Sequence, residues 1–164
     1  MISVNKESIL TFKNKIYKCS IGINGITDSK VEGDGCTPSG KYSFGSLFYR
    51  ADRIKKINTK IKLIPIVNDM YWSDYSNSIY YNKLLKFKDK SFEYLYRKDH
   101  IYDIVLVINY NTNPIIKNKG SAIFMHIAKK NFTPTKGCIA LKKIDFLEIL
   151  KDLDPKNRIN ILNS

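Results

Sequence analysis

The 164-residue sequence lacks any apolar run of the roughly 18 residues that a membrane-spanning helix requires. Its first twenty residues also lack the basic start, apolar middle and small-residue cleavage site of a secretory signal peptide. We therefore expect no transmembrane segment, and either a chain that stays inside the cell or an export signal outside this sequence. Because there is no repeat, low-complexity tract or Pro/Ser linker, the length predicts a single domain over residues 1–164.

Cysteine and histidine are scarce, with three and two residues respectively. Cys19, Cys36 and Cys138 cannot all pair within the chain, so at least one thiol is free. No CxxC motif or Cys/His cluster has the spacing of metal ligands, and we expect no metal and no organic cofactor. Cys19 alternates with Tyr17 and Ile21 on one face of a predicted strand, which favours a core position.

Arginine supplies only four of the 28 basic residues, although the net charge of +13 is in the range of proteins that bind anions. The lysines are scattered, without a long block, in a chain that is also crowded with isoleucine and asparagine. This pattern favours a solvated lysine-rich surface and predicts no nucleic-acid partner. The alternative is a preference for an anionic partner, and a cell-wall polymer or an acidic membrane face would satisfy it as well as DNA.

Alternating hydrophobicity is frequent along the chain and predicts a mainly β fold. In KIYKCSIGI (15–23), every second residue from Tyr17 to Ile23 lies on one face of a half-buried strand, and the preceding ILTF (9–12) forms a hairpin with it. IYDIVLVINY (101–110) is rich in β-branched residues, which is typical of a central strand. The other predicted strands are SAIFMHIA (121–128) and RINIL (158–162).

Helical periodicity is clearest in KKIDFLEILKDLDP (142–155), which Pro155 ends. Its predicted apolar stripe consists of Ile144, Leu147, Leu150 and Leu153. SFEYLYRKD (91–99) is a candidate for a second, shorter helix. The sequence therefore predicts a mainly β domain with one or two packed helices.

The strongest candidate for chemistry is TPTKGC (133–138), which ends in Cys138 and follows His126. Alternation over 121–128 turns Met125 and its alternate neighbours towards the core, so His126 is expected to point towards a cleft. A thiol is a sluggish nucleophile until a base or a positive charge favours the thiolate, and histidine is the side chain that titrates near neutrality. The pair is therefore a candidate nucleophile and base.

The neighbours of Cys138 fit the same interpretation. Gly137 lets the backbone turn sharply, so that N–H groups can point at a developing oxyanion. Thr135 could hold the turn through a local hydrogen bond, and Lys136 adds positive charge beside the thiolate. The alternative is a plain turn from a loop into a strand, because a spacing of twelve residues between histidine and cysteine is not diagnostic.

The sequence resembles the L,D-transpeptidase catalytic domain (YkuD) family, in its compact single-domain branch. The family pattern is a histidine on a strand, a variable loop and Ser/Thr-x-Gly-Cys, which His126, Thr135, Gly137 and Cys138 match. EGDGCTPSGKYSFG (32–45) is similar to the family's Gly-Asp-Gly-x-Thr-Pro-x-Gly-x-aromatic segment. The remaining matches follow in the family's order: WSD (72–74), YN (81–82), SFEYL (91–95), YDIVLVINYN (102–111) and GSAIFMHI (120–127).

The resemblance implies a β-sandwich-like fold whose cleft holds Cys138 and His126. It implies that Cys138 attacks a carbonyl of a peptidoglycan stem peptide, that His126 is the general base and then the acid, and that backbone amides around Gly137 stabilise the oxyanion. The acyl-enzyme then passes to an amine on another stem (transpeptidation) or to water (carboxypeptidase or cross-link endopeptidase activity). Donor and acceptor stem peptides are the expected partners of a monomer.

Five residues in the matching segments are predicted to contact substrate: Trp72, Tyr110, Asn111, Thr135 and Lys136. Two positions depart from the family, because Lys136 stands where many members have histidine and Ala140 where larger members often carry arginine. The family implies the cell envelope or periplasm, and the cytoplasm is the alternative because no signal peptide is visible.

Overall fold

The computed structural model describes residues 1–164 and is mainly β, with a single α-helix. That helix, α1, has ten residues and is too short to cross a membrane. The elements in chain order are β1 (Ile2–Val4), β2 (Ile9–Phe12), β3 (Lys15–Ser20), β4 (Ile26–Thr27), β5 (Thr37–Pro38), β6 (Gly40–Tyr49), β7 (Leu63–Pro65), β8 (Tyr71–Ser73), β9 (Leu84–Leu85), β10 (Phe92–Tyr94), β11 (Ile104–Ile108), β12 (Phe124–Ile127), the 3-10 helix η1 (Lys130–Phe132), β13 (Ile139–Leu141), α1 (Lys143–Asp152) and β14 (Arg158–Ile161).

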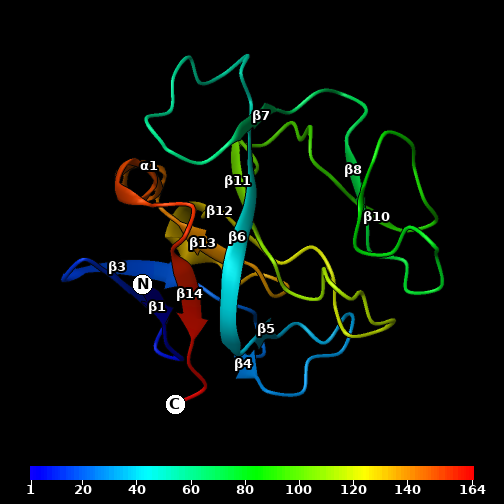
Figure 1. The fold of residues 1–164 in the computed structure, drawn as a ribbon, viewed down its shortest axis with the longest axis horizontal. Helices are drawn as coiled ribbons and strands as arrows, with labels where there is room; N and C mark the ends of the chain where they lie inside the picture. Colours follow the sequence, from blue (N-terminus) through cyan, green and yellow to red (C-terminus); the bar gives the residue numbers. More distant parts are fainter.

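The largest sheet closes on itself through the long strand β6. Its strand order is β11-β12-β13-β3-β2-β1-β14-β6-β7, and β6 also pairs with β11. The first part of β6 pairs with β14 and the later part pairs with β11, so that β6 joins the two ends of the sheet (Figure 1). Within this sheet β12 and β13 are parallel neighbours, which brings two segments separated by a loop side by side.

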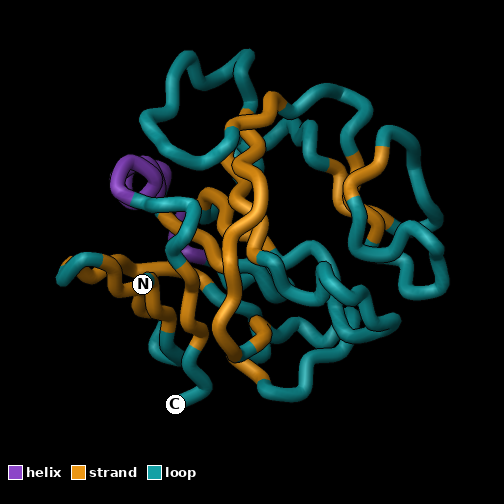
Figure 2. Tube along the Cα trace, viewed as in Figure 1, coloured by secondary structure: helices purple, strands orange, loops and turns teal.

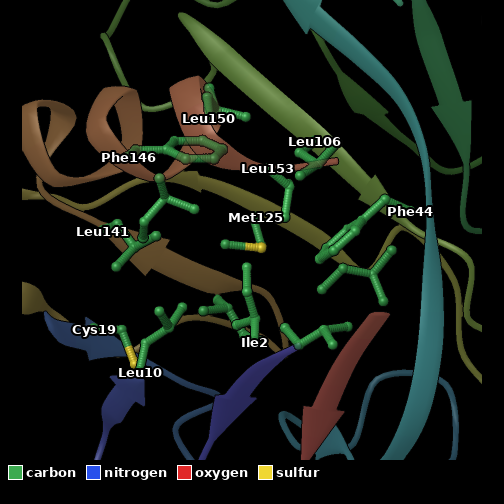
Figure 3. Packing of buried hydrophobic residues seen from close by; sticks show 14 of the residues in the cluster. Ile2, Leu10, Cys19, Phe44, Leu106, Met125, Leu141, Phe146, Leu150 and Leu153 are labelled. Carbon is green, nitrogen blue, oxygen red and sulfur yellow. The ribbon is translucent and has the colours of Figure 1, made fainter. Parts of the chain in front are cut away.

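The main core lies inside the closed sheet, since eight of its nine strands, all except β7, contribute buried side chains to it. In Figure 3 the Met125 side chain lies between Phe146 and Leu150 of α1 on one side and Ile2 and Leu10 of the N-terminal strands on the other. The predicted core face of residues 121–128 is therefore confirmed.

The opposite face of β11 and β12 is covered by a smaller three-stranded sheet of order β10-β8-β9 (Figure 2). Phe124 and Val105 belong to the second buried cluster on this face, together with Trp72 of β8 and Tyr102. Cys138 packs against the same cluster. Side chains on the outer face of β12, and Cys138 just before β13, therefore pack towards the smaller sheet.

The predicted strand at 9–12 is confirmed as β2, and those at 101–110, 121–128 and 158–162 are confirmed in shortened form as β11, β12 and β14. β2 and β3 form the expected hairpin. One detail of the 15–23 strand is wrong: Tyr17, Cys19 and Ile21 are buried, but Ile23 is 68% exposed because β3 ends at Ser20 and the chain turns away.

The structure has one of the two predicted helices. α1 covers 143–152, but its buried side chains are Phe146, Ile149 and Leu150, while Ile144 is 75% exposed. The second helix is wrong, because residues 92–94 form β10, which pairs antiparallel with β8. The partner strand of residues 92–94 lies about twenty residues earlier in the chain, so the local sequence does not reveal it.

Candidate active site

His126 and Cys138 lie on the same face of two paired strands. Parallel pairing sets Met125 opposite Ile139 and His126 opposite Ala140. Since side chains alternate along a strand, His126, Ala140 and Cys138 point to the outer face of the large sheet, away from Met125. Cys138, just before β13, is therefore the diagonal neighbour of His126, and both line one cavity.

The Cys138 thiol is held by two backbone groups of the strand beside it. Its S–H donates to the carbonyl of Ala122 at 3.2 Å, and the N–H of Phe124 donates to Sγ at 3.4 Å. Burial raises the pKa of Cys138 to about 12. The Cys138 side chain is therefore a neutral thiol at neutral pH.

His126 is oriented by a backbone carbonyl. Its Nδ1 lies 2.9 Å from the oxygen of Ile127, and because a carbonyl only accepts hydrogen bonds, Nδ1 carries the proton and Nε2 keeps its lone pair. The Tyr102 ring packs edge-on against the imidazole, with centroids 5.3 Å apart. Burial lowers the pKa of His126 to about 4, so the ring is a neutral base at neutral pH.

The turn that presents Cys138 depends on glycine and threonine. Gly137 has φ of 142°, and a Cβ there would lie 2.7 Å from the carbonyl oxygen of Cys36, so the site excludes any larger residue. Thr135 Oγ1 accepts from the Gly137 N–H at 3.1 Å and donates to the Cys138 carbonyl at 2.6 Å. Thr37 Oγ1 also donates to the Gly137 carbonyl at 2.8 Å.

The cavity around these residues has a volume of about 1030 Å³. Thr135 and Lys136 line it, as does Ala140. Both hydrogen bonds of the Thr135 hydroxyl go to the backbone of Gly137 and Cys138, so this side chain holds the turn, as the sequence predicted. Lys136 has no ion-pair partner.

The cavity also contains charged residues that the sequence did not single out. Glu93 of β10 and Asp74 after β8 lie on one face of the smaller sheet, and both line the cavity with Glu32. Tyr102 donates to Glu93 Oε2 at 3.1 Å, and burial raises the pKa of Glu93. Asp74 Oδ1 is buried and has no hydrogen-bond partner. Only the pairing of β8 with β10, which is non-local, brings these carboxylates together.

Three of the predicted substrate contacts lie elsewhere. Trp72 is buried against Phe124 and donates from Nε1 to Asn82, and it does not line the cavity. Tyr110 and Asn111 line a separate cavity of about 310 Å³. Asn111 ties its own loop together by donating to the carbonyls of residues 116 and 120. The structure does not bring these three residues to Cys138.

Residues 2–161 match the model of the YkuD family, described as the L,D-transpeptidase catalytic domain. The chain belongs to this family. The predicted family and the mainly β fold are thereby confirmed, and His126, Thr135, Gly137 and Cys138 of this YkuD domain are the residues that matched the family's motif. No cluster of three or more His, Cys, Asp or Glu side chains could hold a metal ion.

Among solved structures, the YkuD chain is similar to the crystal structure of the helical cell shape determining protein Pgp2 from Campylobacter jejuni, with 16% sequence identity and a TM-score of 0.48. That alignment covers 99% of this chain and 47% of Pgp2. A lysine-to-alanine mutant of Pgp2 gives the same identity and TM-score, with 46% of its chain covered. The chain thus spans about half the length of these proteins. No curated protein matches it.

Proposed function

We propose that this chain is an L,D-transpeptidase that acts on peptidoglycan stem peptides through a Cys138 acyl-enzyme, with His126 as general base and acid. The observation that carries the proposal is that a thiol and a neutral imidazole share one face of two paired strands inside a single cavity. Membership of the YkuD family supports the reaction class. We expect the protein to act in the cell envelope, where this substrate lies.

The proposed reaction has two stages: acylation of Cys138 and transfer of the acyl group to an acceptor amine. Nε2 of His126 takes the thiol proton while Sγ of Cys138 attacks the carbonyl that joins a diamino acid to the terminal D-alanine. The tetrahedral intermediate collapses, the C–N bond breaks, and His126 returns the proton to the leaving amine. An acceptor amine then attacks the thioester and gives a proton to His126, a new C–N bond forms as the C–S bond breaks, and His126 returns that proton to Sγ.

The oxyanion of the intermediate needs N–H donors near Cys138. The N–H of Gly137 already donates to Thr135, whereas the N–H of Cys138 has no hydrogen-bond partner. We therefore assign the Cys138 N–H as the oxyanion donor of this turn. Lys136 adds positive charge at the same wall of the cavity.

The carboxylates of the cavity support a substrate that carries a free amino group. Glu32, Asp74 and Glu93 line the cavity, and none of them forms an ion pair, although basic residues outnumber acidic ones by 28 to 15. The cations Lys30 and Arg97 of the same cavity are already paired with aspartates. An ammonium group of a diamino acid would complement the unpaired carboxylates.

Replacing Glu93 with glutamine is expected to raise KM for a stem-peptide donor about tenfold, because a hydrogen bond to a charged group is worth roughly 1.5–3 kcal/mol. A donor whose free amino group is acetylated should show no such rise. Steady-state kinetics with the two donors measure the effect. The matched control is Glu148→Gln, because Glu148 pairs with Lys15 on the surface of α1. Equal KM changes for both donors would contradict an ammonium contact.

The proposal is tested with a tetrapeptide stem donor, with and without an acceptor amine, followed by mass spectrometry of the products. A transpeptidase forms the cross-linked product and depends on the acceptor. Release of D-alanine alone in both reactions would identify water as the acceptor, which makes the protein an L,D-carboxypeptidase with the same Cys138 and His126 chemistry. Absence of any product with a folded protein would contradict both.

A further inference from the structure

Asn82 lies between β8 and β9, and its buried side chain makes four hydrogen bonds. Oδ1 accepts from Trp72 Nε1 at 2.9 Å and from the Ala122 N–H at 3.0 Å. Nδ2 donates to the carbonyls of Tyr110 at 3.2 Å and Asn111 at 2.7 Å. These contacts use both lone pairs and both N–H groups of the amide, so the side chain has a single orientation.

Ala122 joins this amide to the nucleophile. Its φ of 51° lies in the left-handed region, which is unfavourable for a residue with a Cβ and persists only where surrounding contacts fix it. Its N–H is held by Asn82, and its carbonyl accepts the hydrogen bond of the Cys138 thiol at 3.2 Å. A single residue in an unusual conformation therefore connects a fully bonded amide to Sγ.

We propose that Asn82 is a positioning residue of the acyl-transfer site, which fixes Ala122 in the conformation that aims its carbonyl at the Cys138 thiol. This inference rests on the proposed function for its catalytic consequence. Asn82 does not line the cavity. It acts through Ala122.

The consequence for the thiol follows from the direction of the hydrogen bond. A carbonyl that accepts from S–H stabilises the neutral thiol and not the thiolate. The same bond, with the Phe124 N–H on the other side, fixes Sγ on the wall of the cavity. Without Asn82, we expect a thiol that ionises more readily but is aimed less well.

The test variant is Asn82→Gly, because Asn82 itself has φ of 55° and glycine keeps that conformation while it removes the amide. Alkylation of Cys138 by iodoacetamide at pH 8, followed by peptide mass spectrometry, is expected to become roughly three- to tenfold faster, as the loss of one hydrogen bond to the thiol predicts. On a stem-peptide donor, kcat should fall about tenfold while KM changes less than twofold.

Two further variants separate this role from a general loosening of the fold. Asn14→Gly replaces another left-handed asparagine, which is exposed in the turn between β2 and β3, and its alkylation rate should stay at the native value. Asn82→Asp keeps an acceptor for the Ala122 N–H, and its alkylation should be no faster than that of the native protein. If Asn82→Gly does not fold, Asn82→Ala, which also removes the amide, is measured in its place with the same expected increase.

A native alkylation rate in folded Asn82→Gly would overturn the proposal, and so would faster alkylation in Asn14→Gly or Asn82→Asp. Alkylation needs no peptidoglycan substrate. If the alkylation result appears but no stem peptide is turned over by the native protein, the proposed function has failed while the positioning of the thiol stands.

Discussion

Cys138→Ala is expected to abolish turnover of a stem-peptide donor, by at least about 10⁴-fold, and to leave the fold intact. The Cys138 thiol lies on the same strand face as the neutral imidazole, and the proposed covalent intermediate cannot form without it. The folding cost should be small, because alanine fits where cysteine does and only two long hydrogen bonds to Sγ are lost.

The measurement is intact-mass analysis after incubation with a carbapenem, whose strained carbonyl acylates an accessible nucleophile, together with product release from the donor. The native protein should gain one adduct, and Cys138→Ala should gain none. Cys36→Ala is the matched control, since Cys36 is a partly exposed thiol across the turn from Gly137 and does not line the cavity. An adduct that persists in Cys138→Ala would assign the chemistry to another residue.

The position of His126 could be predicted from sequence because a strand alternates its side chains with a fixed period. Once Met125 is assigned to the core, His126 has to face the other way, and the structure confirms this. A sharp turn at Gly137 could also be predicted, although the Cys36 carbonyl that excludes a Cβ there comes from a distant part of the chain. In contrast, the approach of Cys138 to His126 depends on parallel pairing of β12 and β13 across a loop. Only the family resemblance, and not the spacing, anticipated it.

The errors arose where non-local contacts decide the structure. Residues 92–94 have helical spacing, yet they form an edge strand because β8 offers a partner. Ile144 fits an apolar stripe, but Phe146 and Ile149 dock on the core and rotate it to the surface. The prediction that Trp72 contacts substrate rested on a family segment, and the structure places Trp72 beside Asn82 and outside the cavity. Local periodicity cannot distinguish these cases.

His126→Ala is expected to lower kcat/KM by about 10²–10⁴-fold, the usual contribution of a positioned general base. It should also slow carbapenem acylation without removing the site of the adduct. His100→Ala is the matched control, because His100 is exposed, pairs with Asp103 and does not line the cavity. Unchanged acylation in His126→Ala would contradict the role of His126 as base.

The low pKa of His126 also predicts how the free energy of unfolding depends on pH. Burial lowers the pKa of folded His126 to about 4, whereas an unfolded histidine titrates at about 6.5. Between these values the unfolded chain binds more protons, so the free energy of unfolding falls as the pH drops from 6.5 to 4, by up to about 3 kcal/mol. Above pH 6.5 both states are neutral and His126 makes no pH-dependent contribution.

The pH profile of kcat/KM should reflect the pKa of His126 in the folded protein and not that of an unfolded histidine. kcat/KM reports the free enzyme, so its acid limb should lie near pH 4 while the protein stays folded, because only then does His126 lose the lone pair that accepts the Cys138 proton. Chemical denaturation at pH 7, 6 and 5 should show the loss of stability in the native protein and not in His126→Ala. An acid limb near pH 6.5, with stability that does not change over this range, would mean that His126 is exposed to water and that the cavity opens before it reacts.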